Sequence, residues 1–470
     1  MQDEEVHRHL ANVLGPHNIS VDEASLRRYA SDALRPGRFF PGSDTLQPRP
    51  QWVTWPETVA QVQELLRFAS QHAIPVVPYG GGTGLMGGAT ASTGGIVLSL
   101  SKLDRIREVC ADDLIVTAEA GVVLRDLDAA LNQQGLILGH DPWTVPVATV
   151  GGAISTNSLG YRGAVYGSMG EQVLGMEVVL PDGSLVATRA VPKSSTGLSL
   201  QHLFIGGEGC FGVITAATIK AFPQPEQRSL HALHFPDFPS AYRTVTRLFH
   251  IGIVPSLLDM GEEFDLEANS AAPVTEVIEM YLGFEGVREV VDAQAGRTRT
   301  IWLAEGGIEQ DPQEARHFWE SRHLAADGFR RRREESGLAP YFQPASPPVM
   351  DYAHMAIPAS KVLSFREQCM QLIARHKVGL REFGLWNRPE LFSVVLVDRH
   401  GMQDDRLGRA MEAMLMLAQD MGGSMEYCHG VGLRLAYLME REHGTGLDLL
   451  KKLKHTLDPK GIMNPGKLGL

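Results

Sequence analysis

Residues 75–100 contain the feature that most limits the fold, a glycine-rich loop between two short apolar segments. The stretch reads PVVPYGGGTGLMGGATASTGGIVLSL. Because glycine has no Cβ, successive backbone N–H groups of such a loop can point into one concavity, which is a binding site for phosphate or pyrophosphate. The sequence therefore predicts a strand, an anion-binding loop and a second strand.

Two common phosphate-binding motifs fit this loop poorly. Gly82–Gly87 matches the pattern G-x-G-x-x-G, with Asp104 at a suitable distance for a ribose contact. A Rossmann unit, however, needs a crossover helix of about ten or more residues after the glycines, and only the small-residue stretch 88–95 precedes the next strand. A P-loop is excluded because its lysine and adjacent hydroxyl residue are absent. A plain glycine-rich turn is the alternative.

Two further glycine clusters follow. Residues 142–170 include Ser155, Thr156 and Asn157, whose hydroxyl and amide groups could bond a ribityl chain or a phosphate. Residues 205–214, IGGEGCFGVI, precede a β-branched segment. Three glycine clusters separated by predicted strands indicate one extended ligand, such as a dinucleotide, rather than a single phosphate.

Together the three clusters resemble the FAD-binding domain of the vanillyl-alcohol oxidase and p-cresol methylhydroxylase superfamily. The run Leu457–Lys467, LDPKGIMNPGK, is similar to the end of its D-lactate dehydrogenase and glycolate oxidase branch. Covalent members often place a flavin-linking histidine in the first loop, where this chain has Thr83, so the resemblance implies non-covalent FAD. The residues that it implies for FAD binding are Tyr79, Gly80, Gly81, Gly82, Thr83, Gly84, Pro142, Thr149, Val150, Gly151, Gly152, Thr156, Asn157, Gly160, Glu208, Gly209, Gly212, Ile214 and Asn464.

The resemblance also implies an α+β fold class, with a two-subdomain FAD-binding (PCMH-type) domain and a ferredoxin-like α+β cap domain. A chain of 470 residues is too long for one ordinary core. We expect residues 1–225 to form the FAD-binding domain, residues 226–424 the cap that selects the substrate, and residues 425–470 a segment that returns to the FAD-binding domain. After Pro223 and Pro225, strand-like and helix-like segments alternate, which is typical of an α+β layer.

Composition limits the partners and the compartment. The net charge of −12 argues against a nucleic-acid surface, and we interpret the basic run Arg330–Arg333 as a solvated helix face. Four scattered cysteines, an N-terminus without signal-peptide character and the lack of an apolar run of about 18 residues indicate a cytoplasmic protein without a transmembrane segment. The electron acceptor is not identified by the sequence, and a homodimer is compatible with it.

His429, in the stretch EYCHGVG, is the candidate catalytic base. An unperturbed pKa of about 6.5 would leave the imidazole largely free to take a proton at neutral pH, and Gly430 and Gly432 let the backbone approach a planar ring. Taken alone, a histidine in a glycine-rich turn is more often structural. The resemblance favours catalysis, because the hydroxy-acid branch carries Glu-His-Gly-Ile-Gly here and its histidine is implicated in the reaction.

The sequence departs from that branch at the family's metal site. Cys428 replaces the glutamate before the histidine, and residues 384–392, GLWNRPELF, lack both histidines of the metal-binding stretch. Zn²⁺ needs three or four N, O or S ligands. Cys428 and His429 could supply only two, so we expect no bound metal. We expect Cys428 to be a buried structural thiol rather than a ligand or a nucleophile.

Arg322, in FWESR, resembles the W-x-x-R arginine that approaches the substrate's acid group in the family's cap. A guanidinium can bind a carboxylate with two parallel hydrogen bonds. An ion pair with Glu320 or Asp327 is the alternative, and Arg388 and Arg381 are weaker candidates.

Three functional hypotheses follow. The first is an FAD-dependent dehydrogenase or oxidase that moves a hydride from a small anionic 2-hydroxy acid, such as D-lactate or glycolate, to flavin N5, with His429 taking the hydroxyl proton and Arg322 orienting the acid. The second is a redox-neutral flavin transferase similar to alkyldihydroxyacetone-phosphate synthase, whose further histidines and active tyrosine are missing here. The third is a flavin-binding subunit of a larger complex.

Overall fold

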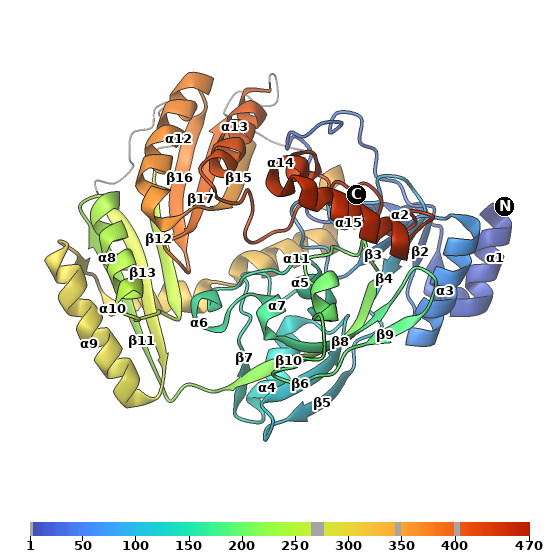
Figure 1. Cartoon of the computed structure of the whole chain (residues 1–470), viewed down its shortest axis with the longest axis horizontal. Helices are drawn as coiled ribbons and strands as arrows, with labels where there is room; N and C mark the ends of the chain where they lie inside the picture. Colours follow the sequence, from blue (N-terminus) through green and yellow to red (C-terminus); the bar gives the residue numbers. More distant parts are fainter. Residues whose placement is uncertain (1–2, 265–276, 344–348, 399–404) are drawn as a thin grey trace.

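The computed structural model describes residues 3–264, 277–343, 349–398 and 405–470. Three β-sheets with flanking helices make up this part of the chain, so the predicted α+β class is confirmed. Figure 1 shows the third sheet on one side of the molecule and the first two, with both chain ends, on the other.

The first sheet is built around the glycine-rich loop. Its part of the chain contains α1 (Asp3–Leu14), β1 (Ile19–Ser20), α2 (Glu23–Tyr29), β2 (Trp52–Thr54), α3 (Val59–His72), β3 (Val76–Tyr79) and β4 (Ile96–Ser99). The strand order is β1–β2–β4–β3, and β3 runs parallel to β4. The loop between them contains no helix, so the predicted strand–loop–strand unit is confirmed and the connection is not a Rossmann crossover. Helix α3 buries Val62, Leu65 and Leu66, as their spacing predicts.

The second sheet is antiparallel and has six strands in the order β5–β6–β10–β8–β9, with β7 also paired to β10. Its elements are β5 (Ile106–Cys110), β6 (Ile115–Glu119), α4 (Leu124–Asn132), β7 (Leu136–Leu138), α5 (Val150–Ser155), α6 (Gly163–Tyr166), α7 (Met169–Gln172), β8 (Val173–Val179), β9 (Leu185–Ala187) and β10 (Val213–Pro223). Strands β8 and β9 form a hairpin at Asp182-Gly183, a turn-forming sequence, where Gly183 has a φ of 81° that suits glycine.

The third sheet has seven strands in the order β14–β11–β13–β12–β16–β17–β15. Its part of the chain contains β11 (Gln227–Phe235), α8 (Phe238–His250), β12 (Leu257–Glu263), β13 (Ile278–Gly286), α9 (Arg288–Ala304), β14 (Ile308–Glu309), α10 (Pro312–Ser321), α11 (Leu324–Ser336), β15 (Val349–Ala356), α12 (Val362–His376), β16 (Gly379–Trp386), β17 (Leu391–Asp398) and α13 (Arg406–Asp420). All its strand pairs are antiparallel.

Side chains alternate between the two faces of this sheet. On one face, Phe392 of β17 is fully buried against Phe365 of α12, with ring centroids 5.4 Å apart. On the other face, His354 of β15 and Trp386 of β16 line an internal cavity. Since helices cover the first face, the second is available to form a roof over the rest of the molecule.

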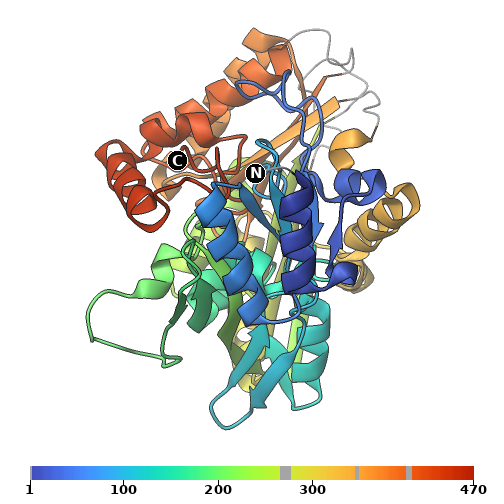
Figure 2. The same cartoon turned by 90° about the vertical axis from the view of Figure 1, so that its right-hand side faces the viewer.

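The C-terminal segment returns to the first sheet. After α14 (Met439–His443) and α15 (Thr445–Leu457), Met463 forms a parallel bridge with Val76, and Figures 1 and 2 show the two chain ends close to this sheet. The fully buried Lys467 donates a hydrogen bond of 2.6 Å to the carbonyl of Thr90. The tail thereby holds the end of the glycine-rich loop.

The sheets change between Pro223, the end of β10, and Gln227, the start of β11. We therefore propose the division into residues 1–225, 226–424 and 425–470 as the domain organisation. None of the helices in the described ranges combines the length and the apolar character that a bilayer crossing requires.

Candidate active site

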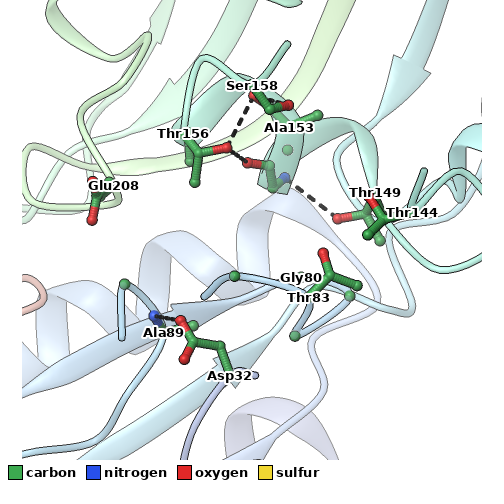
Figure 3. Close-up of a pocket in the computed structure, with 18 of the residues that line it drawn as sticks. Asp32, Gly80, Thr83, Ala89, Thr144, Thr149, Ala153, Thr156, Ser158 and Glu208 are labelled. Carbon is green, nitrogen blue, oxygen red and sulfur yellow. Dashed lines mark hydrogen bonds between the residues drawn. The ribbon is translucent and has the colours of Figure 1, made fainter. Parts of the chain in front are cut away.

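The first cavity lies between loops of the first and second sheets. Its empty volume is about 1170 Å³, part of it open to solvent. Figure 3 shows Asp32, Thr83 and Ala89 on one side of this cavity and Thr149 and Thr156 on the other. All three predicted glycine clusters contribute to its walls.

Most of the residues predicted to bind FAD line this cavity. They are Tyr79, Gly80, Gly81, Gly82, Thr83, Gly84, Pro142, Thr149, Gly151, Gly152, Thr156, Glu208, Gly209, Gly212 and Ile214. The other four, Val150, Asn157, Gly160 and Asn464, are not among its wall residues. Of these, Asn157 accepts a hydrogen bond from Gly170 N, and the Asn464 amide donates to the carbonyls of Gly88 and Glu208. These two side chains hold the loops that form the walls.

The backbone amides of the first loop are available for an anion. From Gly81 to Gly88, none of them donates a hydrogen bond to another residue in the described part of the chain. Backbone N–H groups are almost always paired when they are shielded from water, so a run of free donors beside a cavity fits a bound pyrophosphate. The donor set of this loop therefore suits the phosphate portion of a dinucleotide.

Close backbone approach explains two of the glycines in this loop. A Cβ on Gly80 would lie 2.5 Å from Thr149 Oγ1, and a Cβ on Gly81 would lie 2.3 Å from the carbonyl oxygen of Val147. Thr149 caps α5 by accepting a hydrogen bond from Gly152 N. The first two glycine clusters thus contact each other directly, and a larger residue at Gly81 would force them apart.

Glu208 connects the third cluster to the segment that carries His429. Its carboxylate accepts hydrogen bonds from Val431 N at 2.6 Å and Gly432 N at 2.8 Å. Burial raises the pKa of Glu208 to about 7 even though these amides favour the carboxylate. A Cβ on Gly432 would lie 2.1 Å from the carbonyl oxygen of Met86, so this glycine allows the segment to pack on the first loop.

A second, larger cavity lies under the open face of the seven-stranded sheet. Its walls include Tyr352 and His354 of β15 and Trp386 of β16. Thr83, Leu85, Trp143, Cys428 and His429 line both cavities. The two spaces therefore meet at His429, which is the predicted base.

The charge of His429 is set by its neighbours. Its Nδ1 lies 3.5 Å from Glu426 Oε1, an ion-pair distance without hydrogen-bond geometry. Burial alone would lower the pKa of the imidazole, but Cys428 and the Glu426 carboxylate outweigh it and raise this pKa well above 6.5. The ring of His354 lies perpendicular to that of His429 at 4.5 Å, and burial together with the His429 charge lowers the pKa of His354 to about 3.

Cys428 is half-buried and lies at the junction of the two cavities. Its thiol lies 3.9 Å from the carbonyl oxygen of Leu159. Among the residues that the structure describes, no group of three or more His, Cys, Asp or Glu side chains has the arrangement of a metal site.

Arg322 does not line either cavity. Its Nε donates to Asp141 Oδ2 at 3.0 Å, and its guanidinium lies 3.9 Å from the ring centroid of Trp319. Arg162 and His323 also contact Asp141, whose pKa is lowered because these partners outweigh its burial. Arg322 thus forms an ion pair, although with Asp141 rather than with Glu320 or Asp327.

Several wall residues had no recognisable signal in the sequence. Asp32 accepts a hydrogen bond from Ala89 N and contacts the first loop, but it lies in an irregular segment before the first motif. The solvated-face interpretation of the basic run is wrong for Arg333, which donates to the carbonyl of Gly81 and to the hydroxyl of Tyr79. Asp259 and Glu382 line the second cavity from β12 and β16. Both strands carry further charged residues, so nothing in the sequence marked these two.

Two family models match this chain. Residues 50–189 match the FAD binding domain, and residues 224–468 match the C-terminal domain of FAD linked oxidases. These matches confirm FAD as the cofactor, in agreement with the free amides of the first loop.

Three relatives align along most of the chain. The glycolate oxidase subunit GlcD of Bacillus subtilis is 27% identical, with 100% of this chain and 97% of the relative covered. The D-lactate dehydrogenase of Archaeoglobus fulgidus is 29% identical, with coverage of 88% and 90%. The D-2-hydroxyglutarate dehydrogenase of Xanthomonas citri pv. viticola is 30% identical, with coverage of 96% and 94%.

Two solved structures share the fold. An alkyldihydroxyacetonephosphate synthase superposes with a TM-score of 0.77 at 18% identity, over 99% of this chain and 85% of that chain. A p-cresol methylhydroxylase superposes with a TM-score of 0.75 at 16% identity, over 99% and 96%. This likeness concerns the fold alone, and it confirms the predicted PCMH-type architecture.

Proposed function

The chain belongs to the family of FAD-linked oxidases, and on this premise we propose that it oxidises a small 2-hydroxy acid to the corresponding 2-oxo acid. The observation that carries the proposal is the position of His429, on the wall shared by the two cavities. A cofactor in the first cavity and a substrate in the second would both be next to this imidazole. The three relatives act, by their names, on glycolate, D-lactate and D-2-hydroxyglutarate.

The proposed reaction removes two electrons and two hydrogens from the substrate. Bound FAD supplies the acceptor for the α-hydrogen, which leaves as a hydride. His429 in its neutral form takes the hydroxyl proton, so that the C–O bond becomes a carbonyl. Glu426, 3.5 Å from His429 Nδ1, stabilises the imidazolium that results.

We propose that FAD lies in the first cavity without a covalent bond. The predicted residues of the three glycine clusters would hold it, with the free amides of Gly81–Gly88 binding the pyrophosphate. Thr83 offers no imidazole for a flavin link. Asn157, Gly160 and Asn464 would act indirectly, by fixing the loops.

The substrate carboxylate needs a positive partner in the second cavity. The exposed Arg35 and Arg332 line this cavity and can supply it, since His429 has to be neutral to act as the base. Arg322 is engaged by Asp141, so we assign it to holding the cap against the FAD-binding domain. An arginine with this role would affect the substrate only through the position of its neighbours.

A single-turnover experiment tests this function. Purified protein would be mixed without oxygen with D-lactate, glycolate or longer D-2-hydroxy acids, and the flavin absorbance and the 2-oxo acid would be measured together. We expect bleaching with one 2-oxo acid formed per flavin for at least one of these acids. The proposal fails if the flavin stays oxidised with every acid tested.

A further inference from the structure

The sheet side of the second cavity carries two carboxyl groups without protein partners. Asp259 of β12 and Glu382 of β16 both line the cavity. In the described part of the chain, neither side chain has a hydrogen bond or ion pair. Most buried acids are paired, as Asp351 is by Arg38 and Arg434, so these two half-buried acids stand out.

Two glycines lie between these carboxyl groups in the sheet. Gly261 of β12 lies directly opposite Gly384 of β16. The Glu382 carboxylate covers this pair, since a Cβ on Gly384 would lie 3.1 Å from Glu382 Oε1 and one on Gly261 would lie 3.9 Å from it. We call the strip of cavity wall from Asp259 to Glu382 the trough.

Aromatic rings flank the Asp259 end of this trough. Trp386 is paired with Asp259 across the two strands, and the ring of Tyr161 meets that of Trp386 edge-on at 5.3 Å. Both rings line the cavity. Carboxylates next to aromatic faces are the surroundings in which organic ammonium groups bind.

The electrostatics of the trough favour a positively charged ligand. Burial first, and then the charge of Glu382, raise the pKa of Asp259 to about 7, and burial also raises the pKa of Glu382. A raised pKa means that no cation of the protein offsets the hydration that each carboxylate loses. A bound cation would stabilise both carboxylates, whereas a carboxylate on the ligand would be repelled by them.

Basic side chains also line the second cavity. Arg35 and Arg332, exposed at the wall, supply positive charge. His429 lies where this cavity meets the first one. The cavity therefore offers guanidinium groups for a carboxylate as well as the two acids.

On the premise of the proposed function, we propose that the substrate is a 2-hydroxy acid whose far end carries an ammonium group, and that this group binds in the trough between Asp259 and Glu382. The α-carboxylate and the hydroxyl lie at the His429 end. A hydroxy acid with a second carboxylate at its far end, as in the compound named for the Xanthomonas relative, is disfavoured because it would meet two unpaired acids.

Three six-carbon acids of matched length test this assignment. They are 2-hydroxyhexanoate with a neutral tail, 2-hydroxyadipate with a carboxylate tail and 6-amino-2-hydroxyhexanoate with an ammonium tail. The readout is kcat/KM for flavin reduction. We expect the ammonium acid to exceed the neutral acid by about tenfold or more, as for a charge-assisted hydrogen bond, and the carboxylate acid to be the poorest.

Neutral variants locate the preference. In Asp259→Asn and in Glu382→Gln, the ratio of kcat/KM for the ammonium acid to that for the neutral acid should fall by about tenfold. Glu108→Gln is the control, because Glu108 is an exposed strand residue outside the cavity. That variant should keep the wild-type ratio.

The outcomes separate the two proposals. If none of the acids, including D-lactate and glycolate, reduces the flavin, the proposed function is wrong. If the neutral or carboxylate acid is used as well as the ammonium acid, the function stands and the ammonium assignment is overturned. A ratio that is unchanged in both trough variants also overturns it.

Discussion

Glu208 accepts a hydrogen bond of 2.8 Å from the backbone amide of Gly432, although 224 residues separate them in the sequence. The same carboxylate binds Val431 N, so one side chain ties the third glycine cluster to the segment that carries His429. Since the first cavity is bordered by both, this contact holds the predicted base next to the cofactor site.

We expect Glu208→Gln to destabilise the protein and to slow flavin reduction. A glutamine offers one oxygen to the two amides and turns its own N–H groups toward the other, which costs about 1–3 kcal/mol for a buried group. Thermal unfolding and the rate of flavin reduction measure the two effects. Glu108→Gln, on an exposed strand position, is the control and should change neither. An unaltered melting temperature in Glu208→Gln would contradict this role.

The rate of flavin reduction should rise with pH. His429 acts as a base only when neutral, and Cys428 and Glu426 raise its pKa well above 6.5. kcat/KM should therefore increase as pH rises through this pKa and then level off. The contribution of the His429–Glu426 ion pair to stability has the opposite pH dependence. It is complete below the pKa of His429 in the unfolded protein, and it is lost as pH rises through the pKa of His429 in the folded protein.

Replacing Glu426 tests the cause of that profile. Glu426→Gln removes the carboxylate that helps to raise the pKa, so the inflection in kcat/KM should move to lower pH. His429→Asn should lower kcat by about 10²–10⁴-fold at every pH. An inflection that stays in place, or that moves upward in Glu426→Gln, would show that another group controls the profile.

Gly81→Ala should impair FAD binding. The new Cβ would lie 2.3 Å from the backbone oxygen of Val147, which cannot move without shifting the second cluster. We expect about 1–3 kcal/mol of lost binding free energy, or roughly tenfold or more in Kd, measured by flavin fluorescence during titration of apoprotein. Gly296→Ala, in helix α9 with nothing within 4 Å of its Cβ, should bind FAD normally. Equal affinity of both variants would refute the close approach.

Arg322→Ala distinguishes an ion pair from a substrate contact. Loss of the bonds to the buried Asp141 should lower the melting temperature, at a cost of about 1–3 kcal/mol. KM for a 2-hydroxy acid should change by less than about threefold, because this arginine makes no contact with the substrate that the substitution could remove. A large rise in KM with normal stability would instead place this guanidinium on the substrate.

Local sequence patterns were sufficient for the elements that hold the site. The apolar spacing in Glu57–His72 predicts a helix, which the structure has as α3, and the run Ile96–Leu100 predicts β4. The glycine clusters predict a dinucleotide site, because backbone access depends on the glycines themselves. His429 was predicted from the resemblance of EYCHGVG to the hydroxy-acid branch, and the structure places it on the wall of both cavities.

Local sequence patterns do not predict contacts between segments that are distant in the sequence. Nothing near Arg322 in the sequence indicates Asp141, which lies 181 residues away. Likewise, the opposition of Asp259 and Trp386 depends on the register of β12 and β16, and a shift of one residue would turn Asp259 to the other face. The raised pKa of His429 also depends on the fold of its loop, which places Glu426 beside it.

The central claim is that the two cavities meet at His429, with the cofactor on one side and the hydroxy acid on the other. A crystal structure of the FAD-loaded protein with a slowly reacting 2-hydroxy acid tests it most directly. We expect the flavin in the first cavity and the acid in the second, with its hydroxyl within hydrogen-bond reach of the His429 imidazole. An acid bound away from this imidazole, or a flavin outside the three glycine clusters, would contradict the account.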